Sequence, residues 1–392
     1  MITSNTTLNS IFYVRIFAIF LYSFSNYSCS KTKGVIDENH PIVIHLNPNN
    51  NHLPIVNYVD SLSLVNLEMS KNSIISEAIG IQKIIYKNSK YFILDGRYME
   101  IKVFDSTGKY LYNIGNLGLA KGQFLKIEDI EYFKDHNSIF VLCNDPTKIS
   151  EFSLDGTILN EVNMDFWATA FTVTGPDSRI FYVNQNSSVQ SEDKNILLTD
   201  SSYKIYTKMF KVPRNLKHMT IKFSGGLFNV NGETYFNPAF SNIYYKFHSD
   251  TATACYKIDY GTKNVPEDIL PKILLNSLSN YNFQSYTFVK SNDYIGFNYM
   301  NNNQLSTAFY NMHSGNIATA ETDLDSLNIL FQGPIFQSEN KFFITVLDSR
   351  NLNSFIRRNA AKIREKFPHL YSHLNLENPN PALLIFKLKP SI

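Results

Sequence analysis

The amino-acid sequence predicts an all-β fold, namely a six-bladed β-propeller with two short inserted helices. From Ile81 onward, short runs of β-branched and aromatic residues alternate with clusters of Gly, Asn, Asp and Ser, which is typical of many short strands joined by turns. One such unit recurs further along the chain, as blades of a propeller do. With 392 residues, of which 44% are hydrophobic, the chain is long enough to bury such a ring as one domain.

The chain begins with the features of an export signal. The apolar run Ile16–Phe24 follows a basic residue, has the length of a signal-peptide core and is too short to span a bilayer. Ser28 then precedes Cys29, as a lipoprotein signal peptidase requires, although Asn26 stands where such signals usually carry Leu. We therefore predict a signal peptide over residues 1–28 and lipidation of Cys29, with simple secretion or an uncleaved anchor as the alternatives.

A polar stretch follows the predicted lipidation site. Residues 29–52 are rich in Ser, Lys and Asn, and we expect them to form a lipidated tether. We expect the propeller to occupy residues 53–392 as a single domain. No later run of about 20 apolar residues occurs, so the sequence predicts a protein held at the membrane by its lipid alone.

The other two cysteines, Cys143 and Cys255, lie more than a hundred residues apart in strand-like contexts. Neither belongs to a CxxC pair or to a spacing that resembles a zinc site. We expect two buried free thiols. A disulfide between them would require Cα atoms within about 7 Å, which the sequence leaves open.

The internal repeat is the clearest signal in the chain. The segment Ile93–Leu111 aligns without gaps on the segment Val141–Leu159, at an offset of 48 residues. In each copy two strands lead to a turn that ends in glycine, Gly108 or Gly156, and a third strand follows. A tight hairpin needs a residue that accepts a positive φ at that point. Each copy therefore supplies the antiparallel meander of a propeller blade.

Four weaker copies follow these two, which makes six units. They are built on residues 175–202, 223–247, 287–320 and 334–388. The segment Ile55–Leu67 is also strand-like but precedes the first unit. We expect it to supply the strand that completes the last blade and closes the ring, which leaves no open sheet edge there.

Two segments with helical character interrupt the strands. Residues 266–276 begin with Pro, Glu and Asp, a favourable first turn, and residues 353–367 place apolar side chains on one face before Pro368. We interpret the basic face of the second helix as solvated, with contact to anionic lipid or a partner as the alternative. Its basic residues are Arg357, Arg358, Lys362, Arg364 and Lys366.

Composition and motifs point to no particular chemistry. The formal net charge is only +2, so we predict no nucleic-acid partner. Gly115, Gly118 and Gly122 are not followed by the Lys-Ser or Lys-Thr of a phosphate loop, and His369 with His373 has no following acid. The sequence contains no HExxH and no GxSxG. We predict no catalytic, cofactor-binding or metal-binding residues, and no cofactor.

A propeller can still assemble a site at its centre from residues of different blades. Seven polar residues near strand ends are candidates for such a site: Asp95, Glu128, Asp129, Asn144, Asp145, Asn184 and Asn237. Residues of these types are also common in the turns that follow strands. We therefore interpret all seven as turn-forming and assign none of them a catalytic role.

The sequence resembles the six-bladed β-propeller lipoproteins of Gram-negative cell envelopes, which are themselves similar to NHL-repeat propellers. The resemblance covers most of the chain after Cys29, although Lys121 and Gln123 stand where that family usually has a proline and an acid. It implies a lipid-anchored protein of the envelope. The segment Ser30–Lys33 carries no acid, which favours a periplasm-facing anchor over the outer surface. The resemblance rests mainly on Tyr91–Asp95, Ile101–Asp105, Gly122–Phe124, Gly175–Asp177, Ser241–Tyr244, Tyr256–Gly261 and Asn380–Lys387.

Two functions follow from this resemblance as expectations. The first is a non-enzymatic binding scaffold that holds a protein or glycan partner on an end surface rich in Tyr, Phe and Asn. The alternative is an NHL-like lyase or hydrolase that uses a metal in the central channel. Three or more carboxylate, amide or imidazole groups that converge on one point would favour the enzyme, whereas a self-paired channel would favour the scaffold.

Overall fold

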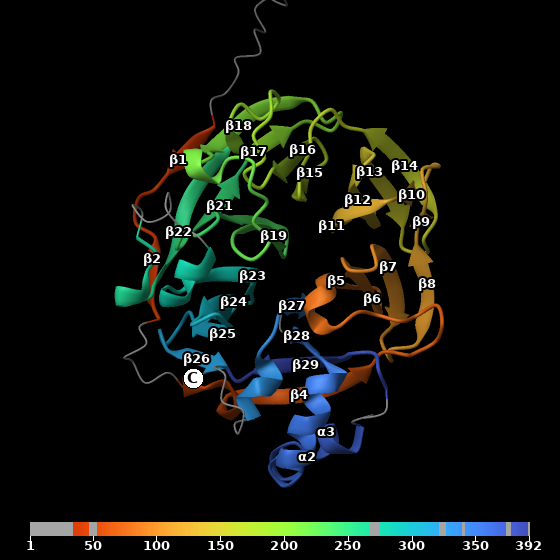
Figure 1. The fold of residues 1–392 in the computed structure, drawn as a ribbon, viewed down its shortest axis with the longest axis vertical. Helices are drawn as coiled ribbons and strands as arrows, with labels where there is room; N and C mark the ends of the chain where they lie inside the picture. The colour runs from red at the N-terminus through yellow and green to blue at the C-terminus, as the bar shows by residue number, and fades with distance from the viewer. Residues whose placement is uncertain are drawn as a thin grey trace, which may run out of the picture. The chain divides into compact units, whose positions relative to one another are not determined.

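Six sheets follow one another around a central axis, which confirms the predicted six-bladed β-propeller (Figure 1). The computed structural model describes residues 34–46, 53–266, 275–320, 327–338, 342–373 and 378–390. These belong to one compact unit, Gly34–Ile392. The predicted signal peptide and Cys29 lie outside the described residues.

Each blade is built on four antiparallel strands, ordered from the centre outward, and two blades carry further strands at their outer edge. The first blade contains β5 (Ile81–Lys87), β6 (Lys90–Asp95), β7 (Glu100–Asp105) and β8 (Tyr110–Ile114). The second contains β11 (Lys126–Phe133), β12 (Ser138–Asp145), β13 (Thr147–Ser153) and β14 (Ile158–Asn163). The third contains β15 (Ala170–Gly175), β16 (Ser178–Tyr182), β17 (Lys194–Thr199) and β18 (Ile205–Lys211).

The second half of the ring repeats this order. The fourth blade contains β19 (Gly226–Val230), β20 (Glu233–Asn237), β21 (Ile243–His248) and β22 (Thr251–Asp259). The fifth contains β23 (Phe283–Lys290), β24 (Tyr294–Asn301), β25 (Gln304–Asn311) and β26 (Ile317–Ala320). The sixth contains β27 (Ile335–Ser338), β28 (Phe342–Leu347), β29 (Ala382–Leu388) and β4 (Val59–Asn66).

The sixth blade confirms the predicted ring closure. Its outermost strand, β4, comes from the N-terminal part of the chain and pairs antiparallel with β29 near the C-terminus, so that Leu64 lies opposite Leu384. The pairing covers the full length of β4. The ring is therefore closed by backbone hydrogen bonds between distant parts of the chain. The edge of β29 that faces β4 is fully paired.

The turn glycines of the repeat have the backbone conformation predicted for them. Gly108 has a φ of 89° and Gly156 a φ of 90°. Gly108 is also limited by space, because a Cβ there would lie 2.1 Å from the carbonyl oxygen of Asn66. This turn therefore meets the closing strand at a distance that only glycine permits.

The core lies between neighbouring blades, where apolar side chains from facing sheets interlock. Most Tyr and Phe side chains are used there, and the largest fully buried ones include Tyr235, Tyr244, Tyr260, Tyr299 and Phe297. The expectation of an end surface rich in aromatic residues therefore stays a prediction. Rings are the largest apolar side chains available, and they fill the space between twisted sheets. Among the described residues, the exposed large aromatic side chains are Tyr98, Tyr206 and Phe342.

Two short strands lie inside the range that the sequence predicted to be tether. β1 (Val35–Asp37) and β2 (Ile42–His45) pair in parallel with β22 and extend the fourth blade outward. A third, β3 (Leu53–Pro54), pairs in parallel with β26 of the fifth blade. Residues 35–37 and 42–45 of the range 29–52 are thus part of a sheet, because their backbone groups pair with the open edge of β22.

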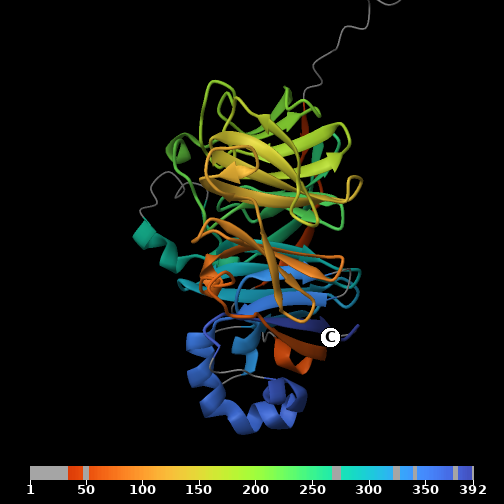
Figure 2. The same ribbon diagram turned by 90° about the vertical axis from the view of Figure 1, so that its right-hand side faces the viewer.

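A helical insertion separates β28 from β29. α2 (Ser349–Lys366) confirms the helix predicted over residues 353–367, while Pro368 begins a second helix, α3 (Pro368–His373). Phe355 and Ile363 are buried against the sixth blade, and Figure 2 shows both helices outside the sheets. Of the helix predicted over residues 266–276, residues 267–274 lie outside the described ranges. No helix in the described part of the chain is long and apolar enough to span a bilayer.

Candidate binding surface

An ion-pair cluster lies between the inner strands of the first and second blades. Lys83 Nζ of β5 lies 3.0 Å from Asp129 Oδ1 and 3.0 Å from Glu131 Oε2, both on β11. The two acidic residues are only 7% and 6% exposed. Asp129 also accepts a hydrogen bond of 3.1 Å from the backbone N–H of Phe171 in the third blade. The cluster therefore joins three consecutive blades.

Burial raises the pKa of both acidic residues in this cluster. It raises the pKa of Glu131 to about 7, because attraction to Lys83 offsets only part of the lost solvation. Burial also raises the pKa of Asp129, against the attraction of Lys83. For Lys83, burial acts to lower the pKa, but the two carboxylates outweigh it and raise the pKa. The charged groups near the centre of the ring are thus occupied with one another.

Sequence reasoning missed Lys83 and Glu131, although a signal for them was present. The two residues are 48 positions apart, which is the offset of the repeat. They therefore occupy equivalent positions on neighbouring inner strands. Residues of opposite charge at equivalent positions of consecutive copies predict an ion pair between blades.

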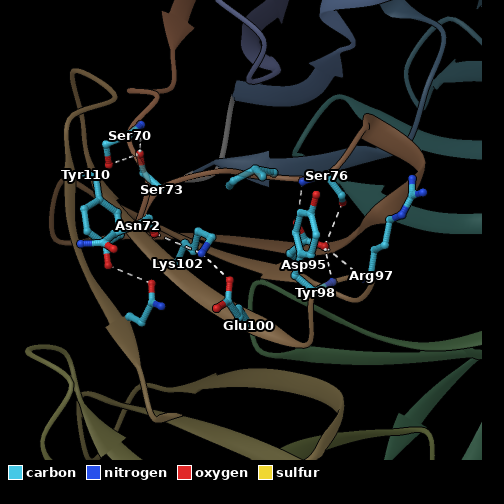
Figure 3. Close-up of polar contacts among 12 residues, drawn as sticks. Ser70, Asn72, Ser73, Ser76, Asp95, Arg97, Tyr98, Glu100, Lys102 and Tyr110 are labelled. Atoms are coloured by element: carbon cyan, nitrogen blue, oxygen red, sulfur yellow. Dashed lines mark hydrogen bonds and ion pairs between the residues drawn. The ribbon is translucent and has the colours of Figure 1, made fainter. Parts of the chain in front are cut away.

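Of the candidate channel residues, Asp95 is engaged in a turn (Figure 3). It is fully buried, and its carboxylate accepts hydrogen bonds from the hydroxyl and the backbone N–H of Ser76 at 2.8 and 2.7 Å. The backbone N–H groups of Arg97 and Tyr98 donate to the same carboxylate at 3.0 and 3.1 Å. Asp95 therefore fixes the turn after β6 to the loop that enters β5.

The other candidates do not converge on one point either. The side-chain amides of Asn144, Asn184 and Asn237 donate to backbone carbonyl oxygens at 2.8 to 3.0 Å. Glu128 Oε1 lies 2.6 Å from Lys126 Nζ, and Asp145 is exposed. Only Asp129 joins the ion-pair cluster. Within the described ranges, no three His, Cys, Asp or Glu side chains are placed to hold a metal ion.

The loop between β4 and β5 is held by a second polar network, part of which Figure 3 shows. Lys102, only 3% exposed, pairs with Glu100 and donates a 3.2 Å hydrogen bond to the carbonyl oxygen of Asn72. Asn380 accepts from the backbone N–H of Ile75 at 3.0 Å and donates to the carbonyl oxygen of Ser73 at 2.8 Å. The loop is therefore fastened to the first and sixth blades.

Exposed leucines occur elsewhere, on the first two blades. One belongs to β8 and one to β14, the outermost strands of these blades, and three belong to the segment that connects the two blades. They are all the exposed leucines in the described part of the chain. We call this group the leucine rim: Leu111 (39% exposed), Leu117 (75%), Leu119 (67%), Leu125 (38%) and Leu159 (50%).

The leucine rim is carried on an ordered frame. The connecting segment forms a small parallel sheet of β9 (Asn116–Leu117) and β10 (Gln123–Phe124), which lies beside β8 and β14 in Figure 1. Phe124 is buried beneath it. The backbone N–H of Gly122 donates a 3.0 Å hydrogen bond to Glu161 of β14, which also pairs with Lys148 at 2.9 Å. The exposed leucines are therefore fixed in place without burial of their side chains.

These features define a closed six-bladed propeller with an ion-pair cluster on two inner strands and exposed leucines on its first two blades. The chain belongs to the family described as a domain of unknown function, DUF4934, whose family model matches residues 41–387. No curated protein matches the chain.

Solved structures similar to this chain support the fold. One is a candidate exported protein from Bacteroides fragilis NCTC 9343, with a TM-score of 0.73 at 16% identity over 88% of this chain and 99% of that one. Another is a DUF4221 protein from Bacteroides vulgatus, with a TM-score of 0.50 at 10% identity over 84% and 97%. A virginiamycin B lyase from Staphylococcus aureus has a TM-score of 0.42 at 14% identity over 73% and 82%, too low to support an argument.

Proposed function

We propose that this chain is a lipid-anchored protein of the cell envelope that binds a protein partner through its leucine rim and catalyses no reaction. The observation that carries the proposal is the group of exposed leucines on the first two blades. Soluble proteins rarely leave apolar side chains clustered in water unless a partner covers them. Leu117 and Leu119 are 75% and 67% exposed although neighbouring residues are firmly packed.

The chemistry of the leucine rim favours a protein over a glycan. Sugar rings are usually held by flat aromatic side chains together with hydrogen-bonding groups, and the rim offers aliphatic side chains instead. Aliphatic surface binds best to other aliphatic or aromatic surface, from which water is released on contact. The hydrogen bonds of Glu161 to Gly122 and Lys148 also favour binding, because a rigid surface loses little conformational entropy when it binds.

The location in the envelope is proposed from the N-terminal sequence. Ser28-Cys29 follows an apolar run of signal-peptide length, and the similar Bacteroides fragilis structure carries the name of an exported protein. A periplasm-facing anchor is the preferred orientation, since Ser30–Lys33 contains no acid. Mass spectrometry of the N-terminal peptide from membranes would test this part, because it should begin at Cys29 and carry the mass of a lipid.

Crosslinking in cells would test the partner. A photoreactive residue at Leu119 should give a defined protein adduct, whereas the same residue at Val189, 88% exposed on the third blade, should not. The captured protein is then purified and its affinity measured. Leu117→Ala and Leu159→Ala should each weaken binding about tenfold if they lie in the contact. Equal adducts at both positions, or unchanged affinity in both variants, would refute the role of the leucine rim.

A further inference from the structure

A second exposed apolar surface lies on the opposite rim, where the described chain begins. It consists of exposed side chains on both faces of β1 and β2, which form the outermost strands of the fourth blade. We call it the β1–β2 edge: Val35 (53% exposed), Ile36 (39%), Ile42 (53%) and Val43 (42%). Ile44, in the same strand as the last two, is completely buried, so β2 is firmly seated on the blade.

The point at which the chain joins the propeller is fixed. The backbone N–H of Val35 donates a 3.1 Å hydrogen bond to the carbonyl oxygen of Asp250, and Val35 lies opposite Thr251 at the start of β22. Gly34 packs so closely against the third blade that a Cβ would lie 2.6 Å from Cγ of Met209. The chain therefore enters the fold between the third and fourth blades, where its backbone is held by pairing with β22 and by close packing against Met209.

Chain length then limits which surface can approach a membrane. Cys29 is five positions before Gly34, and even a fully extended chain of that length reaches only about 18 Å. A folded unit of this size is roughly 50 Å across, by the usual scaling of the radius of gyration. A lipid on Cys29 would therefore draw the rim beside β1 to the bilayer. The opposite rim lies beyond its reach.

We propose that the β1–β2 edge is the surface on which the propeller lies against the membrane. The proposal rests on the proposed lipidation of Cys29. The lipid would supply the affinity, while the four β-branched side chains would set the orientation by entering the interfacial region. Lys31 and Lys33 precede the edge in sequence, and Lys257 is exposed opposite Val43, which suits anionic headgroups. Four acids lie close by. Asp37 accepts hydrogen bonds from Asn39 and Glu38 accepts one from Tyr245. Asp250 precedes the start of β22, and Asp259 pairs with His45 at 3.0 Å.

This orientation assigns different roles to the two apolar surfaces. Figure 1 shows β1 and β2 on one side of the ring, and β9, β10 and β14 on the other. The leucine rim would then face away from the bilayer and remain open to a partner. α2, whose basic face the sequence left open as a lipid contact, lies beside the sixth blade and away from β1.

The test uses the full mature chain, purified from membranes and reconstituted into vesicles of phosphatidylethanolamine and phosphatidylglycerol. A fluorophore is attached at Val43→Cys or, as the matched control, at Leu159→Cys. Lipids with a nitroxide near the headgroup should quench the first label several-fold more strongly than the second. Equal quenching of protein that floats with the vesicles would overturn the proposed orientation. Protein that fails to float would instead overturn the lipid anchor, which separates the two proposals.

Two variants of the Val43→Cys chain complete the test. Adding Val35→Glu and Ile42→Glu should leave flotation unchanged but abolish the stronger quenching, whereas adding Leu117→Glu and Leu119→Glu should leave it intact. Quenching that survives the first pair of changes would show that the apolar edge does not set the orientation. Self-quenching that disappears when unlabelled protein is mixed in would show that a second copy covers the edge, and would likewise overturn the proposal.

Discussion

Lys83 and Glu131 occupy the same position in two consecutive copies of the repeat, and their side chains meet with 3.0 Å between Nζ and Oε2. The inner strands of neighbouring blades thus face each other through a pair of unlike charges. Because the Glu131 side chain is only 7% exposed, the pair couples the stability of the ring to pH. Two predictions concern this cluster directly.

The first prediction concerns Glu131→Gln. Burial raises the pKa of Glu131 from an ordinary value of 4.5 to about 7, so the folded state holds this proton more tightly than the unfolded chain does. Ionisation of Glu131 therefore lowers the free energy of unfolding. The decrease is on the order of 3 kcal/mol as the pH rises from about 4.5 to 7. The glutamine variant should match the native protein at pH 4 and be more stable at pH 8, as measured by urea unfolding.

A control for this prediction is Glu192→Gln, which changes a 71% exposed side chain paired with Lys208. Its effect should be small and independent of pH, because water screens such pairs. If Glu131→Gln proved less stable than the native protein at pH 8, attraction to Lys83 would outweigh the cost of burying the carboxylate.

The second prediction concerns Lys83→Met, which removes the cation but retains a side chain of similar length. Two buried carboxylates would then face each other without a partner, and we expect a loss of about 3–5 kcal/mol at pH 8. The loss should shrink at low pH, where the carboxylates are protonated. Lys208→Met, at an exposed pair, should cost less than about 1 kcal/mol. A loss of equal size at pH 4 and pH 8 would contradict an electrostatic origin.

Much of the architecture could be predicted from the sequence because it depends on local chemistry. The repeat around Gly108 and Gly156 predicted blades, since a hairpin requires a positive φ at those residues. The strand-like segment Ile55–Leu67 predicted ring closure because an unpaired edge is unfavourable. These inferences needed only the order of strands and turns.

The exposed leucines and the strands β1 and β2 were not predicted from the sequence. Both depend on which side of an outer strand faces the solvent. Leu111 and Leu159 have the same character as buried strand residues, and only the position of β8 and β14 at the rim leaves them exposed. The strands β1 and β2 could not be predicted from the sequence for a related reason. Their partner, β22, is some two hundred residues away, and no local pattern marks a strand that is added in parallel to an edge.

The third prediction concerns Asp95→Ala, which removes a buried carboxylate that accepts hydrogen bonds from Ser76, Arg97 and Tyr98. Three backbone N–H groups, of which that of Ser76 is buried, would lose their acceptor, at a cost of about 3 kcal/mol. Amide hydrogen exchange of Arg97 and Tyr98 should accelerate before global unfolding. Asp105→Ala is the matched control.

Asp105 also accepts hydrogen bonds within its own turn, from Thr107 and Lys109, but in an exposed setting. Water can replace this carboxylate, so we expect a cost of only about 1 kcal/mol. Equal costs for the two substitutions would mean that burial does not determine the contribution of such turns.

The fourth prediction concerns the free thiols. Both thiols are free, as predicted, but only Cys143 is buried, while Cys255 is half-buried. Loss of solvation raises the pKa of both to about 12. At pH 8 their reaction with iodoacetamide should be about a thousandfold slower than that of an ordinary cysteine, because so little thiolate is present. After unfolding, two thiols per chain should react if Cys29 carries lipid. Three reactive thiols would contradict the proposed lipidation.

The closing pair of strands has a consequence for how this protein is made. β4 leaves the ribosome among the first residues, while β29, its partner, leaves among the last. No intermediate length of chain contains a complete sixth blade. The sixth blade can therefore form only after synthesis is complete. A chain that lacks its last dozen residues would expose the edge of β4 that pairs with β29. Contacts between segments so far apart in the sequence form slowly, so we expect the closure of the sixth blade to be a late step in folding.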